Sequence, residues 1–254
     1  METTNKIALI TGGSRGLGKN TALKLAKNGN DVIITYRSKK EEADEVVKEI
    51  EEQGLKAAAL QLDTSKIASF DTFKEQLTTT LQQKWNRATF DFLINNAGID
   101  AASPFAKTTE EDFDNLFNVH FKGVYFLTQT LLTTIADGGR IINISTGLTR
   151  FATPGYAAYA SMKGAIEVFT KYLAKELGGR GIAANLVAPG IIETDFTKEA
   201  FNSHPQLHDF ISSITALGRP GQPDDIGGVI AFLCTEDARW INAQRIEASG
   251  GMFL

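Results

Sequence analysis

The chain has 254 residues, 43% of them hydrophobic and 22% charged, with a formal net charge of −4, which is ordinary for a soluble globular protein. The small negative charge gives no reason to expect nucleic acid or an anionic membrane as a partner, and no apolar stretch approaches the roughly 20 residues that span a bilayer. The single cysteine excludes a disulfide within the chain, and the first residues do not resemble a signal peptide, so we expect a cytoplasmic protein.

The first predicted element is a buried strand at residues 6–11, which runs into a glycine-rich turn. From Leu17 onward apolar residues recur at helical spacing, so the glycines lie between the end of a strand and the start of a helix. Glycines there let the backbone approach a pyrophosphate, and the helix N-terminus favours that anion, although a turn without a ligand has the same composition. The candidate dinucleotide loop consists of Gly12, Ser14, Arg15, Gly16, Leu17 and Gly18.

Strands and helices alternate along the rest of the chain. Further strands are predicted at residues 31–36, 56–62, 90–94, 140–145, 182–187 and 245–249. Further helices are predicted at residues 39–53, 67–84, 109–137, 156–177 and 224–234, and the least regular segment is 191–223. The alternation predicts the α/β class, with one doubly wound parallel sheet of about seven strands and helices on both faces. Ligands of such folds bind beyond the carboxyl ends of the strands.

A tyrosine and a lysine on the predicted helix at 156–177 form a candidate proton-transfer pair. Tyr159 and Lys163 are four residues apart, so the phenol and the ammonium lie on one face of the helix. A phenol has a pKa of about 10, and a nearby cation is expected to lower that pKa. The pair predicts a general acid for carbonyl reduction or a general base for alcohol oxidation. Tyr156 has no such partner, because the residue four positions on is Ala160.

Three motifs follow one another in the chain: the glycine loop, the turn Asn95-Asn96-Ala97-Gly98 and the Tyr159/Lys163 pair. Together they resemble the short-chain dehydrogenase/reductase family over residues 6–251, and within it the reductases of the 3-oxoacyl-carrier-protein reductase type. The resemblance implies a single Rossmann-like domain over residues 1–254, with a substrate loop at about 191–222. It also implies hydride transfer between NADP(H) and a ketone or secondary alcohol.

The resemblance assigns further cofactor contacts. Where an acid often binds a ribose 2′-hydroxyl, the second strand ends in Tyr36 and Arg37. Arg37 and Arg15 can bind a 2′-phosphate, which favours NADP(H), although either arginine alone is equally a solvated charge. Asp63 matches a position that contacts the adenine amino group, or else it caps the following helix. The remaining positions are Asn95, Ala97 and Gly98, whose turn is mainly structural, together with Tyr159, Lys163, Pro189, Gly190, Ile192 and Thr194.

The family also places a hydroxyl at the end of the fifth strand, where it holds the substrate carbonyl. Tyr159 lies 13 residues after Thr146, which is the family's usual spacing, and strand alternation sends Ser145 to the opposite face. Ser145 remains the alternative. Asn118 matches an asparagine that holds a water near the lysine, or else it is a buried amide with satisfied partners. The predicted catalytic residues are Asn118, Thr146, Tyr159 and Lys163.

No metal site is expected, because His120, His204 and His208 are too scattered and no Cys/His spacing indicates zinc. Apolar residues of the substrate loop, among them Phe196 and Phe210, predict an apolar mouth for the site. An aliphatic, acyl or aromatic ketone therefore fits better than a sugar, and acyl carrier protein as a partner is left open.

The helices predicted at 109–137 and 156–177 are apolar around most of their circumference, so we expect them to meet a second copy across a two-fold axis. The family resemblance implies a second interface, formed by the last strand and the helix near Ile226, and therefore a homotetramer. The alternative functions are an NADP(H)-binding sensor or structural protein without turnover, and an NAD-dependent alcohol dehydrogenase of the same family.

Overall fold

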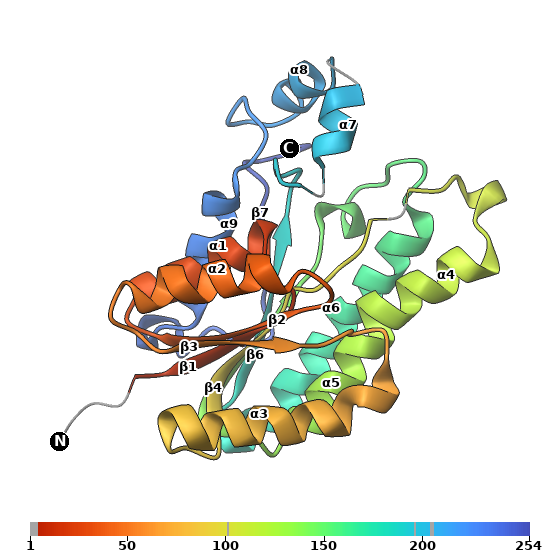
Figure 1. Cartoon of the computed structure of the whole chain (residues 1–254). Coiled ribbons are helices and arrows are strands. Elements are labelled where there is room, and N and C mark those ends of the chain that lie inside the picture. The colour runs from red at the N-terminus through yellow and green to blue at the C-terminus, as the bar shows by residue number, and fades with distance from the viewer. Residues whose placement is uncertain (1–4, 101, 196, 204–205) are drawn as a thin grey trace.

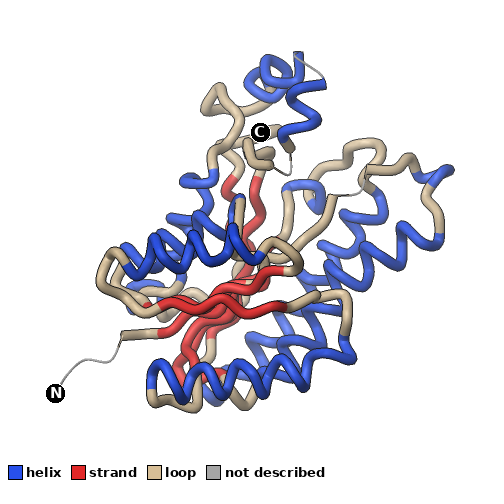
Figure 2. The backbone as a smooth tube through the Cα atoms, in the orientation of Figure 1, coloured by secondary structure: helices blue, strands red, loops and turns tan. Residues whose placement is uncertain are grey.

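A parallel β-sheet runs through the middle of the molecule (Figure 2). The computed structural model describes residues 5–100, 102–195, 197–203 and 206–254. Within these residues the strands are β1 (Ile7–Ile10), β2 (Asp31–Tyr36), β3 (Ala57–Gln61), β4 (Phe90–Asn95), β5 (Ile135–Ile144), β6 (Ala183–Pro189) and β7 (Arg245–Ala248). Their order in the sheet is β3-β2-β1-β4-β5-β6-β7, and all neighbours are parallel. The predicted doubly wound sheet of seven strands is therefore confirmed.

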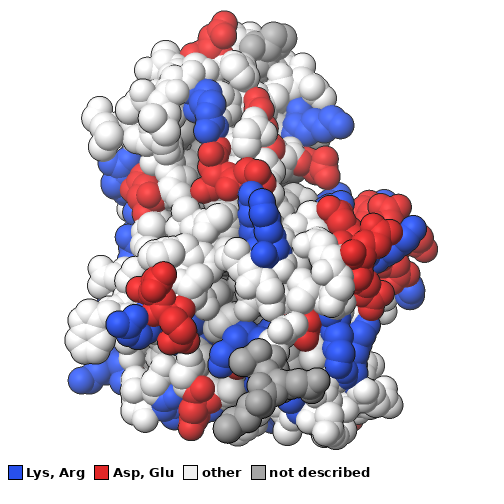
Figure 3. Space-filling view, turned by 90° about the vertical axis from the view of Figure 1, so that its left-hand side faces the viewer, with Lys and Arg blue, Asp and Glu red and all other residues white. Residues whose placement is uncertain are grey.

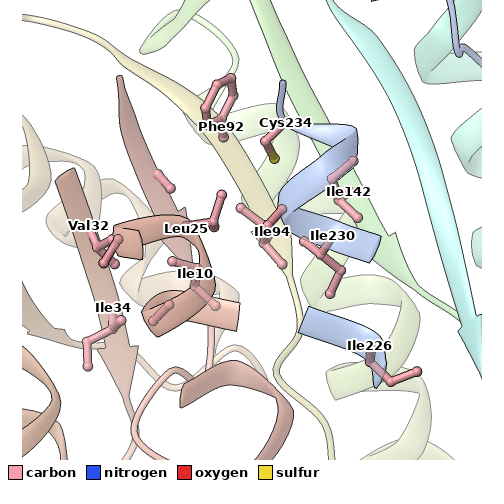
Figure 4. Close-up of a cluster of buried hydrophobic side chains, with 14 of the residues drawn as sticks. Ile10, Leu25, Val32, Ile34, Phe92, Ile94, Ile142, Ile226, Ile230 and Cys234 are labelled. Atoms are coloured by element: carbon pink, nitrogen blue, oxygen red, sulfur yellow. The ribbon is translucent and has the colours of Figure 1, made fainter. Parts of the chain in front are cut away.

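Helices cover both faces of the sheet (Figure 1). They are α1 (Gly16–Lys27), α2 (Lys40–Glu51), α3 (Phe70–Trp85), α4 (Glu110–Phe117), α5 (Gly123–Leu131), α6 (Ala157–Leu177), α7 (Lys198–Ser203), α8 (Gln206–Ser213) and α9 (Pro223–Leu233). One apolar core lies between the sheet and α1, α2 and α9, and a second lies between the sheet and α3, α5 and α6. In the first core, Leu25 and Ile230 reach the sheet beside Ile10 and Ile94 (Figure 4).

The single helix predicted over residues 109–137 is wrong, because the structure has two shorter helices there. α4 begins after Thr109, whose hydroxyl accepts a hydrogen bond from the backbone N–H of Asp112 at 3.1 Å. Thr109 is therefore the N-cap of α4. The following turn, Asn118–Lys122, is a π-helix, and α5 then continues to Leu131. This π-helical turn packs against α6.

The boundary between α5 and β5 also differs from the prediction. β5 begins at Ile135 rather than at residue 140, so Gly138 and Gly139 lie inside the strand instead of ending a helix. The strand pairing shifts at this point, and Gly138 has a φ of 75°. Glycine suits such an irregularity because it adopts positive φ without a steric penalty.

The segment predicted to be irregular contains the two short helices α7 and α8. They lie beyond the end of the sheet at which β6 terminates (Figure 1). Phe210 on α8 is 53% exposed, whereas the neighbouring Ile211 is buried. The predicted loop residues Phe196 and His204 lie outside the described residues.

Positive and negative side chains are interspersed on the face of the molecule shown in Figure 3. That face has no broad stripe of basic residues, so it offers no surface for a polyanion. In the ranges that the structure describes, no helix has the length and apolar character needed to cross a membrane. The same ranges contain no cluster of three His, Cys, Asp or Glu side chains that could hold a metal ion.

Candidate active site

The glycine loop after β1 allows its backbone to come close to neighbouring groups. Gly12 and Gly16 have φ values of 66° and 55°, which glycine adopts more readily than other residues. A Cβ added to Gly18 would lie 2.1 Å from the carbonyl oxygen of Gly12, so α1 packs directly against the loop. α1 begins at Gly16, and no described side chain caps its N-terminus. The uncapped N–H groups of α1 and the glycine-rich loop form a cradle that fits a pyrophosphate.

Asn96 joins this loop to the turn after β4. Its side-chain amide donates to the carbonyl oxygens of Thr11 at 2.9 Å and Gly12 at 3.1 Å. In return, the Thr11 hydroxyl accepts hydrogen bonds from the backbone N–H groups of Asn96 and Ala97, each at 3.0 Å. A Cβ on Gly12 would lie only 3.1 Å from the Cα of Ala97. The structural role inferred for this turn is therefore carried by Asn96, which we did not predict as a site residue.

Asn95, by contrast, is placed away from the candidate cofactor cradle. It is 4% exposed, and its side-chain amide donates to the Thr128 hydroxyl at 3.1 Å and the Asn143 side-chain oxygen at 2.8 Å. Asn95 is the last residue of β4, where successive side chains point to opposite faces of the sheet. The side-chain amide of Asn95 is therefore bound within the fold, and the cofactor contact at this position stays a prediction.

The end of the cradle beside β2 carries the two predicted arginines. Arg15 and Arg37 are both exposed, and the side chain of Gln61 donates to the carbonyl oxygen of Arg37 at 2.9 Å. Within the described residues neither guanidinium forms a salt bridge, whereas nearby Lys40 pairs with Asp44 at 2.5 Å. Both arginines are thus open to a phosphate.

Asp63 stabilises a turn rather than a helix. Its carboxylate accepts hydrogen bonds from the backbone N–H and the hydroxyl of Ser65, at 3.0 Å and 2.7 Å. The 3₁₀ turn that leads into α3 begins only at Ile67, so the alternative of a helix cap is wrong. The half-buried Asp63 side chain lies just past the end of β3, where a contact to an adenine base was expected.

The segment after β6 arches over the glycine loop. Gly16 and Thr194 are far apart in the sequence but close in space, because a Cβ added to Gly16 would lie 3.9 Å from the Cβ of Thr194. Gly190 allows this path, because a Cβ there would lie 3.0 Å from the Cα of Ser249. Ile192 is buried and forms an isolated bridge with Gly221. The predicted residues Pro189, Gly190, Ile192 and Thr194 therefore form a second wall opposite α1.

The two candidate hydroxyls after β5 point in different directions. The Thr146 hydroxyl lies on the Tyr159 side, where it acts to lower the pKa of the phenol. Ser145 is 2% exposed, and its hydroxyl donates to Oε1 of Glu167 at 2.7 Å. Strand alternation therefore brings Thr146, and not Ser145, to the predicted proton donor.

Lys163 lies one turn along α6 from the tyrosine. Its ammonium donates to the carbonyl oxygen of Ile144 at 2.8 Å and lies 5.7 Å from the centre of the Tyr159 ring. Burial lowers the pKa of Lys163 to about 8. The lysine is therefore mostly charged at neutral pH and loses its proton far more readily than an exposed lysine.

The expectation of a lowered pKa for Tyr159 is wrong. Burial raises the pKa of Tyr159 above its ordinary value, and the nearby Asp100 and Tyr156 raise it further. The hydrogen bond from Thr146 opposes this rise without cancelling it. The phenol therefore keeps its proton at neutral pH, as a general acid must.

The π-helical turn brings Asn118 and His120 to the site. The Asn118 carbonyl oxygen accepts the N–H of Gly123, five residues on. The His120 ring meets the Tyr159 ring edge-on at 5.0 Å, and its Nε2 lies 2.8 Å from the carbonyl oxygen of Ile99. Burial, together with the charge of Lys163, lowers the pKa of His120 to about 3, so the imidazole is neutral. We gave His120 less weight than Asn118 from sequence, yet its ring contacts the tyrosine.

Two further residues behind Thr146 escaped the sequence analysis. Glu167 and Arg245 form a salt bridge at 2.8 Å. The available signal was the position of Glu167, which follows Lys163 by four residues and therefore shares its helix face. No sequence pattern indicates a role for Arg245, because its strand is short and its polar and apolar residues do not alternate regularly.

Known proteins share this architecture and sequence. A family model described as enoyl-(acyl carrier protein) reductase matches residues 12–253. The chain belongs to the short-chain dehydrogenase/reductase family. It is 39% identical over 247 residues to an uncharacterized oxidoreductase of Methylorubrum extorquens, covering 97% of each chain. It is also 39% identical over 254 residues to a 3-oxoacyl-[acyl-carrier-protein] reductase of Synechocystis sp., covering 99% of this chain and 98% of that protein.

A solved structure extends the likeness to the whole fold. The angucycline C-6 ketoreductase LanV, crystallised with bound NADP, superimposes with a TM-score of 0.92 and 37% identity, covering 98% of this chain and 95% of LanV. These findings confirm the predicted family and fold. As a member of this family of reductases, the chain is an oxidoreductase.

Proposed function

We propose that the protein is an NADP(H)-dependent carbonyl reductase that interconverts a ketone and a secondary alcohol. The observation that carries this proposal is that the Thr146 hydroxyl, which acts to lower the pKa of Tyr159, a protonated Tyr159 and the buried Lys163 one turn along α6 meet beyond the end of β5. A sensor or structural protein that binds NADP(H) without turnover would need none of these three groups. The bound NADP of LanV supports the cofactor assignment.

The cofactor has a fitting place in this chain. The glycine loop and the uncapped start of α1 would hold its pyrophosphate, and Arg15 and Arg37 its 2′-phosphate. Lys163 and the wall at residues 189–194 would hold the nicotinamide end. When bound, NADPH supplies the hydride.

The chain's own residues handle the carbonyl oxygen. The Thr146 hydroxyl orients this oxygen by donating a hydrogen bond to it, and the Tyr159 hydroxyl donates the proton as negative charge develops there. The charge of Lys163 favours the phenolate that remains after this transfer. The neutral His120 flanks the tyrosine and limits its movement, and Asn118 lies in the same π-helical turn. In alcohol oxidation the same groups act in reverse.

The substrate is a ketone with an apolar portion. Phe105, Phe210 and Leu217 are respectively 85%, 53% and 71% exposed, on the segments that surround the open end of the sheet. Apolar side chains left in water at a site entrance favour an aliphatic, acyl or aromatic ligand over a sugar.

A spectrophotometric panel tests the proposal. The purified protein is mixed with NADPH or NADH and with ketones of increasing apolar size, and the loss of nicotinamide absorbance is followed. We expect oxidation of NADPH with one or more apolar ketones and a lower rate with NADH. Tight NADPH binding without turnover of any ketone or alcohol would favour the sensor, and a preference for NAD with alcohols would favour the dehydrogenase.

The assembly is proposed to be a homotetramer. Phe113 on α4, Tyr125 and Phe126 on α5, and Val168 and Tyr172 on α6 are all exposed. These side chains lie on neighbouring helices on one side of the sheet, where a second copy related by a two-fold axis would cover them. A cytoplasmic location, inferred from the lone and buried Cys234, is also part of the proposal.

A further inference from the structure

A carboxylate on α6 gathers three hydrogen bonds behind the site. Oε1 of Glu167 accepts the hydroxyl of Ser145 at 2.7 Å, the hydroxyl of Thr149 at 2.6 Å and Nε of Arg245 at 2.8 Å. Ser145 and Thr149 lie on either side of Thr146 in the chain. Glu167 therefore fastens both ends of the short turn that carries the carbonyl-binding hydroxyl.

Arg245, at the start of β7, completes the attachment from the opposite side. Its Nη2 donates to the carbonyl oxygen of Thr146 at 3.0 Å and to the Thr149 hydroxyl at 3.2 Å. Its Nη1 donates to Glu247 at 2.9 Å. The planar guanidinium thus holds the main chain of Thr146 itself, while its Nε bonds to Glu167.

The helix that carries this anchor also carries the proton donor. Tyr159, Lys163 and Glu167 follow one another at intervals of four residues on α6. We propose that Glu167, together with Arg245, is a positioning residue that holds the Thr146 hydroxyl in hydrogen-bonding distance of Tyr159. This inference rests on the proposed function of Thr146 and Tyr159.

The charge of Glu167 suits this role. Burial opposes ionisation, but the hydrogen bonds from Thr149 and Ser145 and the adjacent Arg245 outweigh it and lower the pKa of Glu167. A carboxylate has only acceptor sites, so it can receive all three donors. A glutamine in its place would lose the charge, which weakens all three hydrogen bonds to this oxygen.

The Glu167→Gln substitution tests the role of the carboxylate. A loosened turn displaces the Thr146 hydroxyl, and small displacements of a positioning group lower rates by up to ~100-fold. We expect kcat for ketone reduction to fall ~10-fold or more, with the Kd for NADPH changed by less than about twofold. Glu176→Gln, an exposed carboxylate on the same helix, serves as the matched control and should leave both values unchanged.

The pH profile separates positioning from general loosening of the fold. The hydrogen bond from Thr146 lowers the pKa of Tyr159, so its loss should raise that pKa. Alcohol oxidation needs the phenolate, so the acid limb of its pH profile should move to higher pH in Glu167→Gln. A variant that merely contains less folded protein would show a lower amplitude at an unchanged midpoint.

A double variant tests whether the effect passes through Thr146. If Glu167 acts by placing this hydroxyl, Glu167→Gln should add little to the loss already caused by Thr146→Ala. Full multiplication of the two losses would overturn the inference. If Glu167→Gln fails to fold, Ser145→Ala serves in its place, because it removes one of the three hydrogen bonds to Glu167. This variant should show a several-fold loss of kcat and the same shift of the pH profile. An unshifted pH profile in Ser145→Ala would overturn the inference as well.

The failure of this inference is distinguishable from that of the proposed function. If Thr146→Ala retains full activity, the assignment of the carbonyl-binding hydroxyl is wrong. If Thr146→Ala loses activity and Glu167→Gln behaves like Glu176→Gln, only the positioning role is wrong.

Discussion

At the scale of single residues, burial decides the protonation of the candidate catalytic groups. Tyr159 and Lys163 share a helix face as their spacing predicts, but burial raises the pKa of the phenol and lowers that of the ammonium to about 8. The spacing of two residues predicts that their side chains share a helix face. It does not predict how far the side chains are removed from water, which depends on every element packed around them. This is why the site residues were predictable and their pKa directions were not.

The cofactor preference can be tested at Arg37. An aspartate at this position would replace a guanidinium by a charge that repels a 2′-phosphate. We expect Arg37→Asp to weaken NADPH binding by roughly 10- to 100-fold while NADH binding stays nearly constant. Titration of intrinsic fluorescence with each nucleotide gives both constants. Equal losses for the two nucleotides would show that Arg37 does not lie at the adenosine end.

His120 makes a prediction about stability and pH. Its pKa is lowered to about 3 in the folded protein from an ordinary value of 6.5, so the unfolded chain binds the additional proton between these values. Stability from the neutral ring is complete above pH 6.5 and declines as the pH falls toward 3. In urea unfolding between pH 4 and 7, His120→Leu should therefore lose less stability on acidification than the wild type. Parallel losses in the two proteins would contradict the burial of a neutral imidazole.

At the scale of elements, the sequence predicted the order and type of the strands and most helices, and it failed where local irregularities interrupt them. Gly138 and Gly139 resemble a helix stop, yet they form an irregularity in β5, because the pairing with β4 shifts there. The π-helix at Asn118–Lys122 has no signature in apolar spacing. Asn95 and Asn96 are alike in sequence, and only strand alternation in the folded sheet decides which of them faces the glycine loop.

The packing of the glycine loop predicts the effect of one methyl group. A Cβ at Gly18 would lie 2.1 Å from the carbonyl oxygen of Gly12, so Gly18→Ala must displace the loop backbone. We expect NADPH affinity to fall ~10-fold or more and thermal stability to decrease. Gly228→Ala on α9 is the control, because a Cβ there meets nothing within 4 Å, and it should add about 0.5–1 kcal/mol of stability at unchanged affinity. An intact affinity in Gly18→Ala would argue against this loop as the cofactor cradle.

At the scale of the whole molecule, the exposed aromatic side chains of α4, α5 and α6 predict self-association. Tyr125 stacks on Phe169 with ring centres 4.7 Å apart, so this surface is already ordered within one copy. Sedimentation velocity at micromolar concentration should show a species of about four times 27.6 kDa. Tyr172→Glu, which places a charge at a side chain that is 63% exposed, should reduce the assembly without unfolding the chain. A wild-type protein that sediments as a stable monomer would contradict the interface.

The account as a whole depends on Tyr159 as the proton donor of a reduction driven by NADPH. The most direct measurement is a rapid-mixing experiment in which NADPH oxidation by the best ketone of the panel is followed in the wild type and in Tyr159→Phe, with NADPH binding titrated in both. Removal of the proposed proton donor at the carbonyl oxygen should slow hydride transfer by at least ~100-fold, while NADPH affinity changes less than about twofold. Hydride transfer at the wild-type rate in Tyr159→Phe would contradict the central claim.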